Sequence, residues 1–486
     1  IYICLIFKLL HFMKKITKVL LIAICILTVN YFTADAEQII RYVKQDATGN
    51  GTSWENASGD LQAMVDEVEA NADKGEVRVA AGTYYGGFLM KDGVNVYGGY
   101  SAVDNGIRDL KNNKTYLDGE KKSRVLFQNQ DILFQYTTTW DGFYIQNGND
   151  LGAGAFISYR SVLSNCVIRN NTTEGKAWQK GGGVAMKKCQ AAGAPGIAGC
   201  LYNCVIINNH AGDEGGGIFI ENGSVGDVIN CVIANNTSDS SCGGLFLGDW
   251  NGWSCIQNNI IIGNEGGVSQ LYQKQGPLLA TFNNLIQEEG AEAIKGYDPT
   301  AKDDYLTNYF KDNLISANYS LDDIFVKPTS FSGVELLEGD WDEISNSDWS
   351  LKEGSVCINA GTDRNIPIRI NGANPNTQSY SDVFITDICG NKRISGIAPD
   401  MGAYEYGSVL SGLKDVVMLD IQISLVNDIL HLEGIQNTDK VTIVNSLGMM
   451  IYNKTNAEYN IPLLNAGLYI IKVERGNESV VCKILK

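Results

Sequence analysis

The middle of the chain repeats one short alternation of apolar and polar positions. The clearest copies read Asn-Cys-Val-Ile, continue for one residue and end in two asparagines; they cover residues 165–171, 203–209 and 230–236. Weaker copies cover residues 142–147 and 259–264, and successive copies start 23 to 38 residues apart. Periods of this size are typical of solenoids, in which each repeat is one supersecondary unit that packs on its neighbours.

A second apolar segment follows a glycine cluster in each repeat. These segments cover residues 154–157, 183–186, 217–220 and 244–247. No stretch between them is long and apolar enough for a crossover helix, so each repeat is expected to hold two or three short strands. Equivalent strands would stack in parallel about 4.8 Å apart, and parallel connections are overwhelmingly right-handed. The sequence therefore predicts an all-β chain whose body is a right-handed parallel β-helix.

Period-two alternation assigns three columns of stacked side chains in the repeat. The first inward column is predicted to hold Cys166, Cys204, Cys231 and Ile260. The second inward column is predicted to hold Ile145, Ile168, Ile206, Ile233 and Ile262. A third column at the turn is predicted to hold Asn147, Asn170, Asn208, Asn235 and Asn264. We interpret the cysteines as small buried apolar groups and the asparagines as turn residues, so all three columns are architecture.

The N-terminal residues predict export. Lys14, Lys15 and Lys18 precede an apolar run over residues 19–29, and Ala34-Asp35-Ala36 fits a small-x-small cleavage site. This order is that of a secretory signal peptide, so residues 1–36 are expected to be a leader that starts at Met13 and is cleaved after Ala36. No second long apolar run follows, and the mature chain is expected to have no transmembrane span.

Residues 37–300 are assigned to the β-helix with an N-terminal helical cap, and residues 301–407 to its C-terminal part. The cap is predicted over residues 58–71, where four apolar residues share one helical face and Ser58 or Asp60 can serve as the N-cap. These four residues are Leu61, Met64, Val65 and Val68. A strand that begins at Glu76 is expected to open the first coil.

The net charge of −17 narrows the choice of partners. An acidic chain is a poor ligand for nucleic acid, which is therefore not expected as a partner. Acidic groups can hold calcium, but they also keep an extracellular protein soluble. No cofactor is expected, with calcium left open.

Several segments resemble known surface proteins. Residues 41–44, 49–54, 79–84 and 96–100 resemble the opening coils of pectin-lyase-like β-helix proteins of the bacterial cell surface. Residues 357–361 and 398–406 resemble the choice-of-anchor Q domain that ends such helices. The resemblance covers roughly residues 40–407 and implies a fold and an exported protein, but no single activity.

The last seventy residues change to an antiparallel pattern. Apolar alternation over residues 423–432 surrounds the two-residue turn Asn427-Asp428, and further alternating runs follow to Lys486. Residues 415–486 are therefore predicted to form a small immunoglobulin-like β-sandwich. The stretch 467–473 and the basic end resemble the type A sorting domain of the type IX secretion system. That family implies passage through the outer membrane, followed by attachment to the surface or release.

Candidate contacts lie in the loops rather than in the repeat. Exposed aromatic rings stack on sugars, and cations can bind acidic sugars. The candidates for glycan contact are Trp178, Trp250, Trp253, Arg169, Lys176 and Lys180. Glu174, Asp213 and Asp239 fall in equivalent loops of successive coils and are weak candidates for a cation, although exposure to solvent is the simpler expectation. Cys189 and Cys200 flank an insertion and are a candidate disulfide.

Two functions stay open. The first is a non-catalytic, adhesin-like surface protein that contacts glycans. The second is a polysaccharide-degrading enzyme, and a lyase of acidic polysaccharide is favoured over a hydrolase because the repeats contain no pair of adjacent aspartates. A lyase would draw its base from Arg169, Lys176, Lys180, Lys187 or Lys188. No catalytic residue is assigned.

Overall fold

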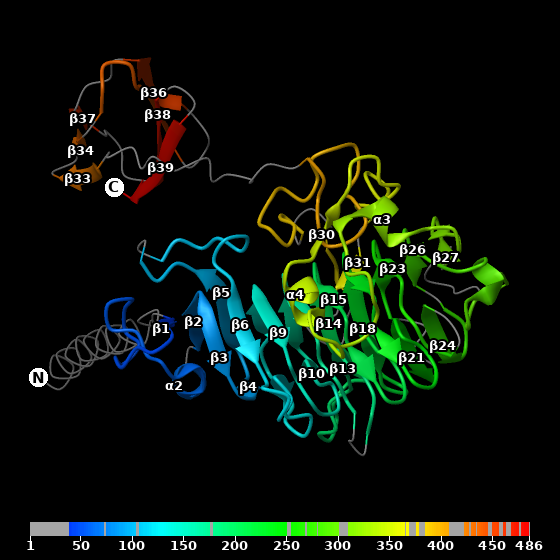
Figure 1. Cartoon of the computed structure of the whole chain (residues 1–486). Helices are drawn as coiled ribbons and strands as arrows, with labels where there is room; N and C mark the ends of the chain where they lie inside the picture. Colours follow the sequence, from blue (N-terminus) through cyan, green and yellow to red (C-terminus); the bar gives the residue numbers. More distant parts are fainter. Residues whose placement is uncertain are drawn as a thin grey trace, which may run out of the picture. The chain divides into compact units, whose positions relative to one another are not determined.

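The structure is a computed structural model of the chain (Figure 1). It describes residues 38–71, 74–103, 106–174, 178–249, 254–267, 270–278, 280–300, 310–364, 366–368, 376–378, 384–407, 422–426, 429–433, 435–445, 450–455, 460–462, 468–475 and 478–485. The chain divides into two units, residues 1–409 and 410–486, which are described separately. The expected leader and its cleavage site at Ala36 lie outside the described residues.

Three parallel sheets wind around the core of the first unit (Figure 1). The ten-stranded sheet holds β1 (Ile39–Val43), β2 (Gly75–Ala80), β5 (Val94–Tyr100), β8 (Thr138–Asp141), β11 (Ser161–Ser164), β14 (Ile197–Tyr202), β18 (Val225–Ile229), β22 (Ile256–Gln257), β25 (Thr281–Phe282) and β27 (Phe310–Lys311). The nine-stranded sheet holds β3 (Gly82–Tyr85), β6 (Thr115–Asp118), β9 (Phe143–Gln146), β12 (Val167–Arg169), β15 (Val205–Ile207), β19 (Val232–Ala234), β23 (Ile260–Ile262), β26 (Leu285–Ile286) and β28 (Leu314–Ile315).

The seven-stranded sheet completes the coils. It holds β4 (Phe88–Met90), β7 (Leu126–Gln128), β10 (Ala155–Ile157), β13 (Val184–Met186), β17 (Ile218–Ile220), β21 (Leu245–Asp249) and β24 (Leu271–Gln275). A short extra ladder pairs β16 (His210–Ala211) with β20 (Thr237–Ser238). A typical coil therefore contributes one strand to each of the three sheets, which confirms the predicted parallel β-helix.

The start of the solenoid is closed by the helix α2 (Leu61–Ala70). Asp60 is the N-cap, and its side chain accepts a hydrogen bond from the amide of Ala63 at 2.9 Å. The four apolar residues of the predicted face are all buried. The first coil opens with β1, ahead of the helix, because Ile39–Val43 pairs in parallel with β2. The expectation that a strand at Glu76 opens the coil is therefore wrong.

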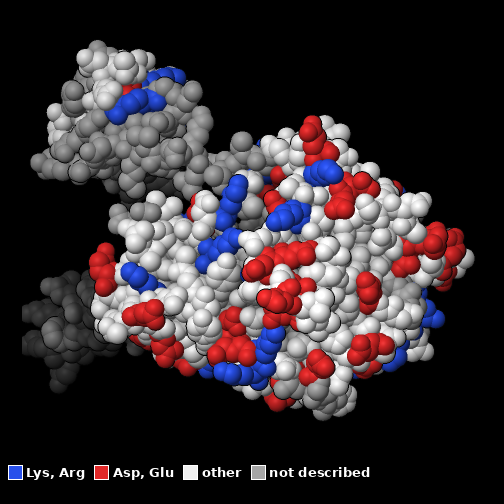
Figure 2. Space-filling view, viewed as in Figure 1, with Lys and Arg blue, Asp and Glu red and all other residues white. Residues whose placement is uncertain are grey.

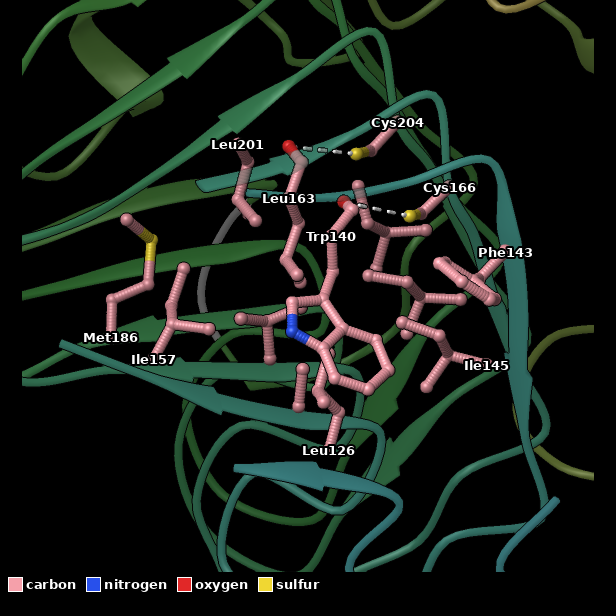
Figure 3. Close-up of a cluster of buried hydrophobic side chains, with 14 of the residues drawn as sticks. Leu126, Trp140, Phe143, Ile145, Ile157, Leu163, Cys166, Met186, Leu201 and Cys204 are labelled. Atoms are coloured by element: carbon pink, nitrogen blue, oxygen red, sulfur yellow. Dashed lines mark hydrogen bonds between the residues drawn. The ribbon is translucent and has the colours of Figure 1, made fainter. Parts of the chain in front are cut away.

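The interior is a column of aliphatic, aromatic and sulfur-containing side chains (Figure 3). Cys166 and Cys204 are fully buried, and their thiols lie 3.7 and 3.5 Å from carbonyl oxygens of Trp140 and Leu163 in neighbouring coils. Burial raises the pKa of both thiols well above the ordinary range, because a thiolate has no water to solvate it there. These cysteines are therefore small core residues, as the pattern predicts.

The last copy of the repeat, residues 259–264, is shifted by one residue from its predicted register. Ile233 pairs with Ile261, not Ile262, and Val232 pairs with Ile260. Asn259 takes the place of the cysteines, and its Oδ1 accepts the amide of Cys231 at 2.8 Å. The sequence carries two consecutive asparagines here, and the left-handed conformation of Asn258 (φ 55°) decides which one sits at the turn.

Asparagines form two columns at the turn that follows the strands of the nine-stranded sheet. The first column is left-handed, with φ between 49° and 68°: Asn147, Asn170, Asn208, Asn235 and Gly263. The next residues, Asn171, Asn209, Asn236 and Asn264, form a buried chain in which each of the first three donates an amide hydrogen to the following one at 2.9 Å. Asn264 thus belongs to the second column, and its predicted place in the first is wrong.

The glycine cluster is explained by this amide chain. A Cβ at Gly183 would lie 2.6 Å from the carbonyl oxygen of Gly217 and 3.0 Å from Nδ2 of Asn209. Side chains do not fit at such distances, so a glycine is needed wherever the chain crosses the buried amides.

Two return segments, residues 319–362 and 384–407, pack on the outside of the nine-stranded sheet. The first contains α3 (Leu321–Ile324), β29 (Phe325–Lys327), α4 (Asp340–Ser345) and β30 (Asp348–Leu351), and η1 (Ala291–Ala293) lies before it. Their buried residues, among them Phe325, Trp349 and Met401, join one apolar cluster with the outward residues of the sheet, such as Val232 and Ile260. A further pair, β31 (Ile366–Ile368) and β32 (Asn376–Gln378), is antiparallel.

The left-handed asparagines hold these return segments. Asn208 Nδ2 donates to the carbonyl oxygens of Phe331 and Gly333 at 3.0 and 3.1 Å, and Asn235 Nδ2 donates to that of Thr329 at 2.8 Å. At the other turn of the same sheet, Asn203, Asn258 and Asn283 donate to carbonyl oxygens of Thr386, Thr362 and Ala360. The turn columns are therefore an attachment edge for the covering layer.

Buried carboxylates organise residues 384–407. Asp387 accepts the amides of Asn391 and Glu405 at 2.8 and 3.1 Å, and Asp400 accepts the amide of Asn359 at 2.6 Å. Burial raises the pKa of Asp387, Asp400 and Glu405 above the ordinary range. The motif from Asp400 to Tyr406 therefore has a structural role, in which buried carboxylates hold the backbone by hydrogen bonds.

The second unit is a small two-sheet sandwich. One antiparallel sheet holds β33 (Gln422–Val426), β34 (Ile429–Glu433) and β37 (Asn460–Pro462); the other holds β35 (Lys440–Asn445), β36 (Met450–Thr455), β38 (Leu468–Arg475) and β39 (Glu478–Leu485). Leu430 and Ile461 from the first sheet pack with Ile443 and Ile471 from the second. This arrangement confirms the predicted small β-sandwich.

A buried ion pair fixes one edge of the sandwich. Arg475 donates to both oxygens of Asp439 at 2.7 and 2.6 Å, and these hydrogen bonds lower the pKa of Asp439. In neither unit, among the described residues, does a helix have the length and apolar character needed to cross a membrane.

Candidate functional site

The outer face of the seven-stranded sheet carries a column of aromatic rings. From β7 to β24 the outward position holds Phe127, Phe156, Ala185, Phe219, Phe246 and Tyr272. Phe246 stacks on both neighbours, with ring centroids 5.7 Å from Phe219 and 5.0 Å from Tyr272. Parallel strands place these positions in register, so the column follows from the period of the repeat.

The column is broken once, at Ala185. A Cβ at Gly152 would lie 2.8 Å from the Cβ of Ala185, and Gly152 has a left-handed φ of 59°. The turn before β10 therefore packs directly over Ala185, and no ring fits at this position. The break separates Phe156 from Phe219.

A groove of about 610 Å³ crosses the sheet beside this break. Leu151 and Phe219 give it apolar surface, and Trp178 and Lys180 line it from the turn before β13. After β13, Lys187 lines it together with Glu221 from the next coil. Gln130, Gln190 and Asn222 add side-chain amides. The groove thus combines an aromatic surface with paired charges and amides.

Both central lysines are held by carboxylates and by aromatic rings. Lys187 Nζ lies 2.8 Å from Glu221 and 5.8 Å from the ring centre of Phe156. Lys180 Nζ lies 2.5 Å from Glu214, 3.5 Å from Asp213 and 5.2 Å from the ring centre of Phe219. Each ammonium group is thus fixed between a carboxylate and an aromatic face.

Trp178 is the exposed aromatic residue of the groove. Its side chain is 68% exposed, whereas Phe219 beside it is 5% exposed. The exposed indole of Trp178 is therefore available to stack on a flat apolar face of a ligand.

The residues predicted to contact a glycan fall into three groups: those in the groove, those outside the described part of the chain, and Arg169, which is buried. Trp178 and Lys180 are brought together in the groove. Lys176, Trp250 and Trp253 lie outside the described residues. Asp249, which directly precedes Trp250 in the sequence, accepts a hydrogen bond at 3.0 Å from Asn222 of the groove.

The expectation that Arg169 contacts a glycan is wrong. Arg169 is 4% exposed, in the nine-stranded sheet under the return segment. Its guanidinium donates to Gln146 at 3.0 Å and to the carbonyl oxygen of Ile344 at 3.2 Å, and lies 5.2 Å from the ring centre of Trp341. Strand alternation does not reveal this burial, because the covering layer comes from residues more than 170 positions later.

The three acidic candidates do not gather into a cation site. Asp213 is bound by Lys180 and by Ser240 at 2.8 Å, and Asp239 lies 3.7 Å from Nε2 of His210. Glu174 is exposed. Within the described ranges, no group of three or more His, Cys, Asp or Glu side chains is arranged to hold a metal ion.

The candidate disulfide is also wrong. Cys189 and Cys200 are both described and both buried, and no disulfide joins them. Cys189 follows β13 of the seven-stranded sheet, whereas Cys200 lies within β14 of the ten-stranded sheet with its thiol 3.8 Å from Asp227. The insertion carries the chain from one sheet to the next, so its two ends do not meet.

Sequence reasoning misses Glu221, Phe219 and the three amides of the groove. The signal for the first two is present in the strand alternation. Phe219 is the middle residue of β17, and Glu221 lies two residues on, so both point outward when Ile218 and Ile220 point inward. The amides come from turns, which carry no such periodicity.

Comparisons with known proteins match the two units separately. Residues 92–286 match the family model for the right handed beta helix region, and this range contains every groove residue named above. Residues 423–486 match the model for a secretion system C-terminal sorting domain. No curated protein and no solved structure matches the chain. Neither model covers residues 357–406, so their resemblance to the choice-of-anchor Q domain stays a prediction. The chain is a secreted cell-surface protein that joins a right-handed β-helix to a type IX secretion system sorting domain, by which it is attached to the surface or released.

Proposed function

We propose that the β-helix binds a polysaccharide chain in the groove of the seven-stranded sheet and holds it without cleaving it. The protein would then act as an adhesin-like surface protein. The observation that carries this proposal is the 68% exposed indole of Trp178 beside a groove lined by paired charges and amides. An aromatic face stacks on the apolar face of a sugar ring, while amides and carboxylates bind its hydroxyl groups.

The shape of the groove supports an extended ligand. Its lining residues come from four successive coils, from Gln130 to Asn222. Coils of parallel strands repeat about every 4.8 Å, so a chain of sugars lying along the axis would meet similar positions on each coil.

The ion pairs favour binding over cleavage. A lyase needs an amine or guanidine free to accept a proton from the sugar. Of the three lysines that line the groove, Lys180 and Lys187 are engaged by carboxylates, which leaves Lys188 as the one candidate base there without an ion pair among the described residues. A hydrolase needs two carboxyl groups, one acting as acid and the other as base or nucleophile. Glu221 is engaged by Lys187, and its role in the groove is better explained as a hydrogen-bond acceptor.

Affinity electrophoresis through gels that contain polysaccharides tests the proposal. We expect retention of the full mature chain by at least one polysaccharide, and an affinity about tenfold weaker for Trp178→Ala, equivalent to roughly 1.4 kcal/mol. Tyr85→Ala is the matched control, because Tyr85 is 63% exposed but lies in β3 of a different sheet.

Two results would contradict the proposal. Equal retention of wild type and Trp178→Ala would remove the groove as the binding site. New reducing ends, or ultraviolet absorbance from an unsaturated uronate, would show that the protein cleaves the polysaccharide and is an enzyme.

A further inference from the structure

We infer that the groove selects neutral polysaccharides over polyuronates. This inference rests on the proposed function and names its ligand class. The reason lies in the charge balance of the groove. Lys180, Lys187, Lys188 and Glu221 line the groove. Beside the lining, Asp213 and Glu214 both pair with Lys180, and Glu221 pairs with Lys187. Lysines and carboxylates are therefore equal in number, and two of the three lysines are paired.

The surroundings do not add positive charge. The chain as a whole has a net charge of −17. On the face drawn in Figure 2, Asp and Glu side chains cover more of the surface than Lys and Arg, and the basic groups lie beside acidic ones. A polyanion approaching this protein is therefore repelled at long range rather than steered.

A polyuronate carries one carboxylate on each sugar. Several of these carboxylates would enter a groove that spans four coils, where only Lys188 among the lining lysines has no carboxylate partner among the described residues. The other carboxylates would lose water without gaining a free cation, which is costly. Neutral sugars carry hydroxyl groups, which both donate and accept hydrogen bonds. A Lys–Glu pair offers a donor and an acceptor side by side, and Gln130, Gln190 and Asn222 each offer both.

The lysines are also fixed in place. The ammonium groups of Lys187 and Lys180 lie over the rings of Phe156 and Phe219, 5.8 and 5.2 Å from their centres. A lysine held by both a carboxylate and a ring cannot turn to a new anion without losing both contacts. Pre-organised groups of this kind favour the ligand that fits the existing arrangement.

The test compares neutral and acidic polysaccharides for the same protein. Galactomannan, xyloglucan and mixed-linkage β-glucan are the neutral probes, and polygalacturonate and alginate are the acidic probes, with a chelator present. We expect the wild-type chain to bind at least one neutral probe about tenfold more tightly than either acidic probe. Raising the salt concentration to about 0.5 M should leave the neutral retention unchanged, because no net charge is neutralised on binding.

Glu221→Gln sharpens the test, because it frees Lys187 while keeping the size of the side chain. We expect it to narrow the preference for neutral probes by about fivefold or more. Glu214→Gln removes the closer of the two carboxylates at Lys180 and leaves Asp213 at 3.5 Å, so it should act in the same direction with a smaller effect. This second variant guards against a folding defect in either one. Trp178→Ala should weaken the binding of every polysaccharide that the wild-type chain binds, by a similar factor.

The outcomes separate the inference from the proposed function. Tighter retention by polyuronate than by every neutral probe would overturn the inference and leave glycan binding in place. An unchanged preference in both glutamine variants would also overturn it. Retention by none of the probes would overturn the proposed function itself.

Discussion

Two sheets of the same solenoid present opposite surfaces. The outward residues of the nine-stranded sheet, such as Val205, Val232 and Ile260, are aliphatic and are buried under residues 319–362 and 384–407. The outward aromatic column of the seven-stranded sheet packs only with residues from its own strands and adjoining turns, among the described parts of the chain. One sheet is thus buried by distant segments of the chain, whereas the rings of the other are buried only by its own strands and turns.

The turns decide which sheet is covered. Left-handed asparagines at both ends of the nine-stranded sheet leave amide hydrogens for the carbonyl oxygens of the return segments. Beside the seven-stranded sheet the turns are glycines, and lysine side chains lie over the rings instead. The difference teaches that repeated residues build the scaffold, whereas ligand contacts are to be sought at positions that do not repeat, such as Trp178.

Replacing one tryptophan beside each sheet should give the largest difference in stability between the two sheets. Trp349 is 2% exposed in the covering layer, with its ring 5.0 Å from that of Phe325, whereas Trp178 is 68% exposed. Trp349→Ala should lower the free energy of unfolding of the β-helix by about 3–5 kcal/mol. Trp178→Ala should change it by no more than about 0.5 kcal/mol while weakening glycan retention. Urea unfolding followed by circular dichroism measures both, and similar losses would mean that the two sheets do not differ.

The attachment edge gives the next contrast. Asn208→Ala removes the hydrogen bonds to Phe331 and Gly333 and leaves a side chain at φ 49° without the asparagine's tolerance for this conformation. We expect a loss of about 2–4 kcal/mol, from roughly 1 kcal/mol for each hydrogen bond and 1–2 kcal/mol for the left-handed backbone.

Asn208→Gly separates these two contributions. Glycine accepts the left-handed conformation, so the loss should fall to about half, while limited proteolysis should still cut faster within residues 329–335. Asn112→Ala, at an exposed turn, is the control and should change neither measurement. Equal losses for the Ala and Gly variants would assign the whole effect to the hydrogen bonds.

A change of pH should act on the covering layer and on the sorting unit with opposite sign. Burial raises the pKa of Asp387, so the folded state binds its proton more tightly than the unfolded state. Its contribution to stability is then present below the unfolded pKa, near 4, and is lost as the pH rises through the higher folded pKa. For Asp439 the hydrogen bonds from Arg475 lower the pKa, so its contribution is present above the unfolded pKa and is lost as the pH falls through the folded pKa.

Hydrogen exchange, corrected for intrinsic rates, measures this difference peptide by peptide. As the pH falls from 7 to about 4, residues 384–407 should gain protection. Residues 435–445 should lose protection only when the pH falls further, below about 4. Asp387→Asn should flatten the first change and leave the second intact. Parallel loss of protection in both segments would show that the buried carboxylates of the covering layer do not favour the protonated form.

The sequence predicts the repeat because the repeat is periodic. Strand alternation and the Asn and Gly columns identify the parallel sheets, the cap helix and the small sandwich, since each has a local pattern. The same reasoning fails at Ile262 and Asn264, where two consecutive asparagines allow two registers. Only the pairing of Ile233 with Ile261 decides between them.

Burial by distant segments is the part that the sequence could not provide. Arg169 lies on the outside of its strand by alternation, as Phe219 does. Nothing local distinguishes a strand that a distant segment covers from a strand that only its own turns cover. Ile344, whose carbonyl oxygen accepts a hydrogen bond from Arg169, belongs to an irregular segment without a repeat signal. Trp178 and Lys180 could be predicted from the sequence because they lie in a loop that departs from the repeat. Glu221 could have been predicted only by continuing the strand alternation beyond the apolar residues of the strand.

Thiol reactivity should show the smallest effect, and it follows the covering layer directly. Cys389 is half-buried in the covering layer, where burial and the nearby Asp387 raise its pKa to about 12. Cys242 is fully buried beneath the aromatic column of the seven-stranded sheet. At pH 8 the thiolate fraction of Cys389 is on the order of 10⁻⁴, compared with about a quarter for a free cysteine, so alkylation of the native chain should be very slow at both positions.

Loosening the covering layer should change only one of these two rates. In Asn208→Ala or Asp387→Asn, water reaches Cys389, its pKa falls toward that of a free thiol, and its alkylation should accelerate about tenfold. Cys242 belongs to the cluster of the seven-stranded sheet, whose described members include no residue of the return segments, and it should keep its native rate until the coils themselves unfold. Peptide mapping by mass spectrometry resolves the two sites in one sample. Acceleration at both cysteines together would mean that the covering layer and the open sheet unfold as one unit, and that the covering layer is as much a part of the solenoid as the coils.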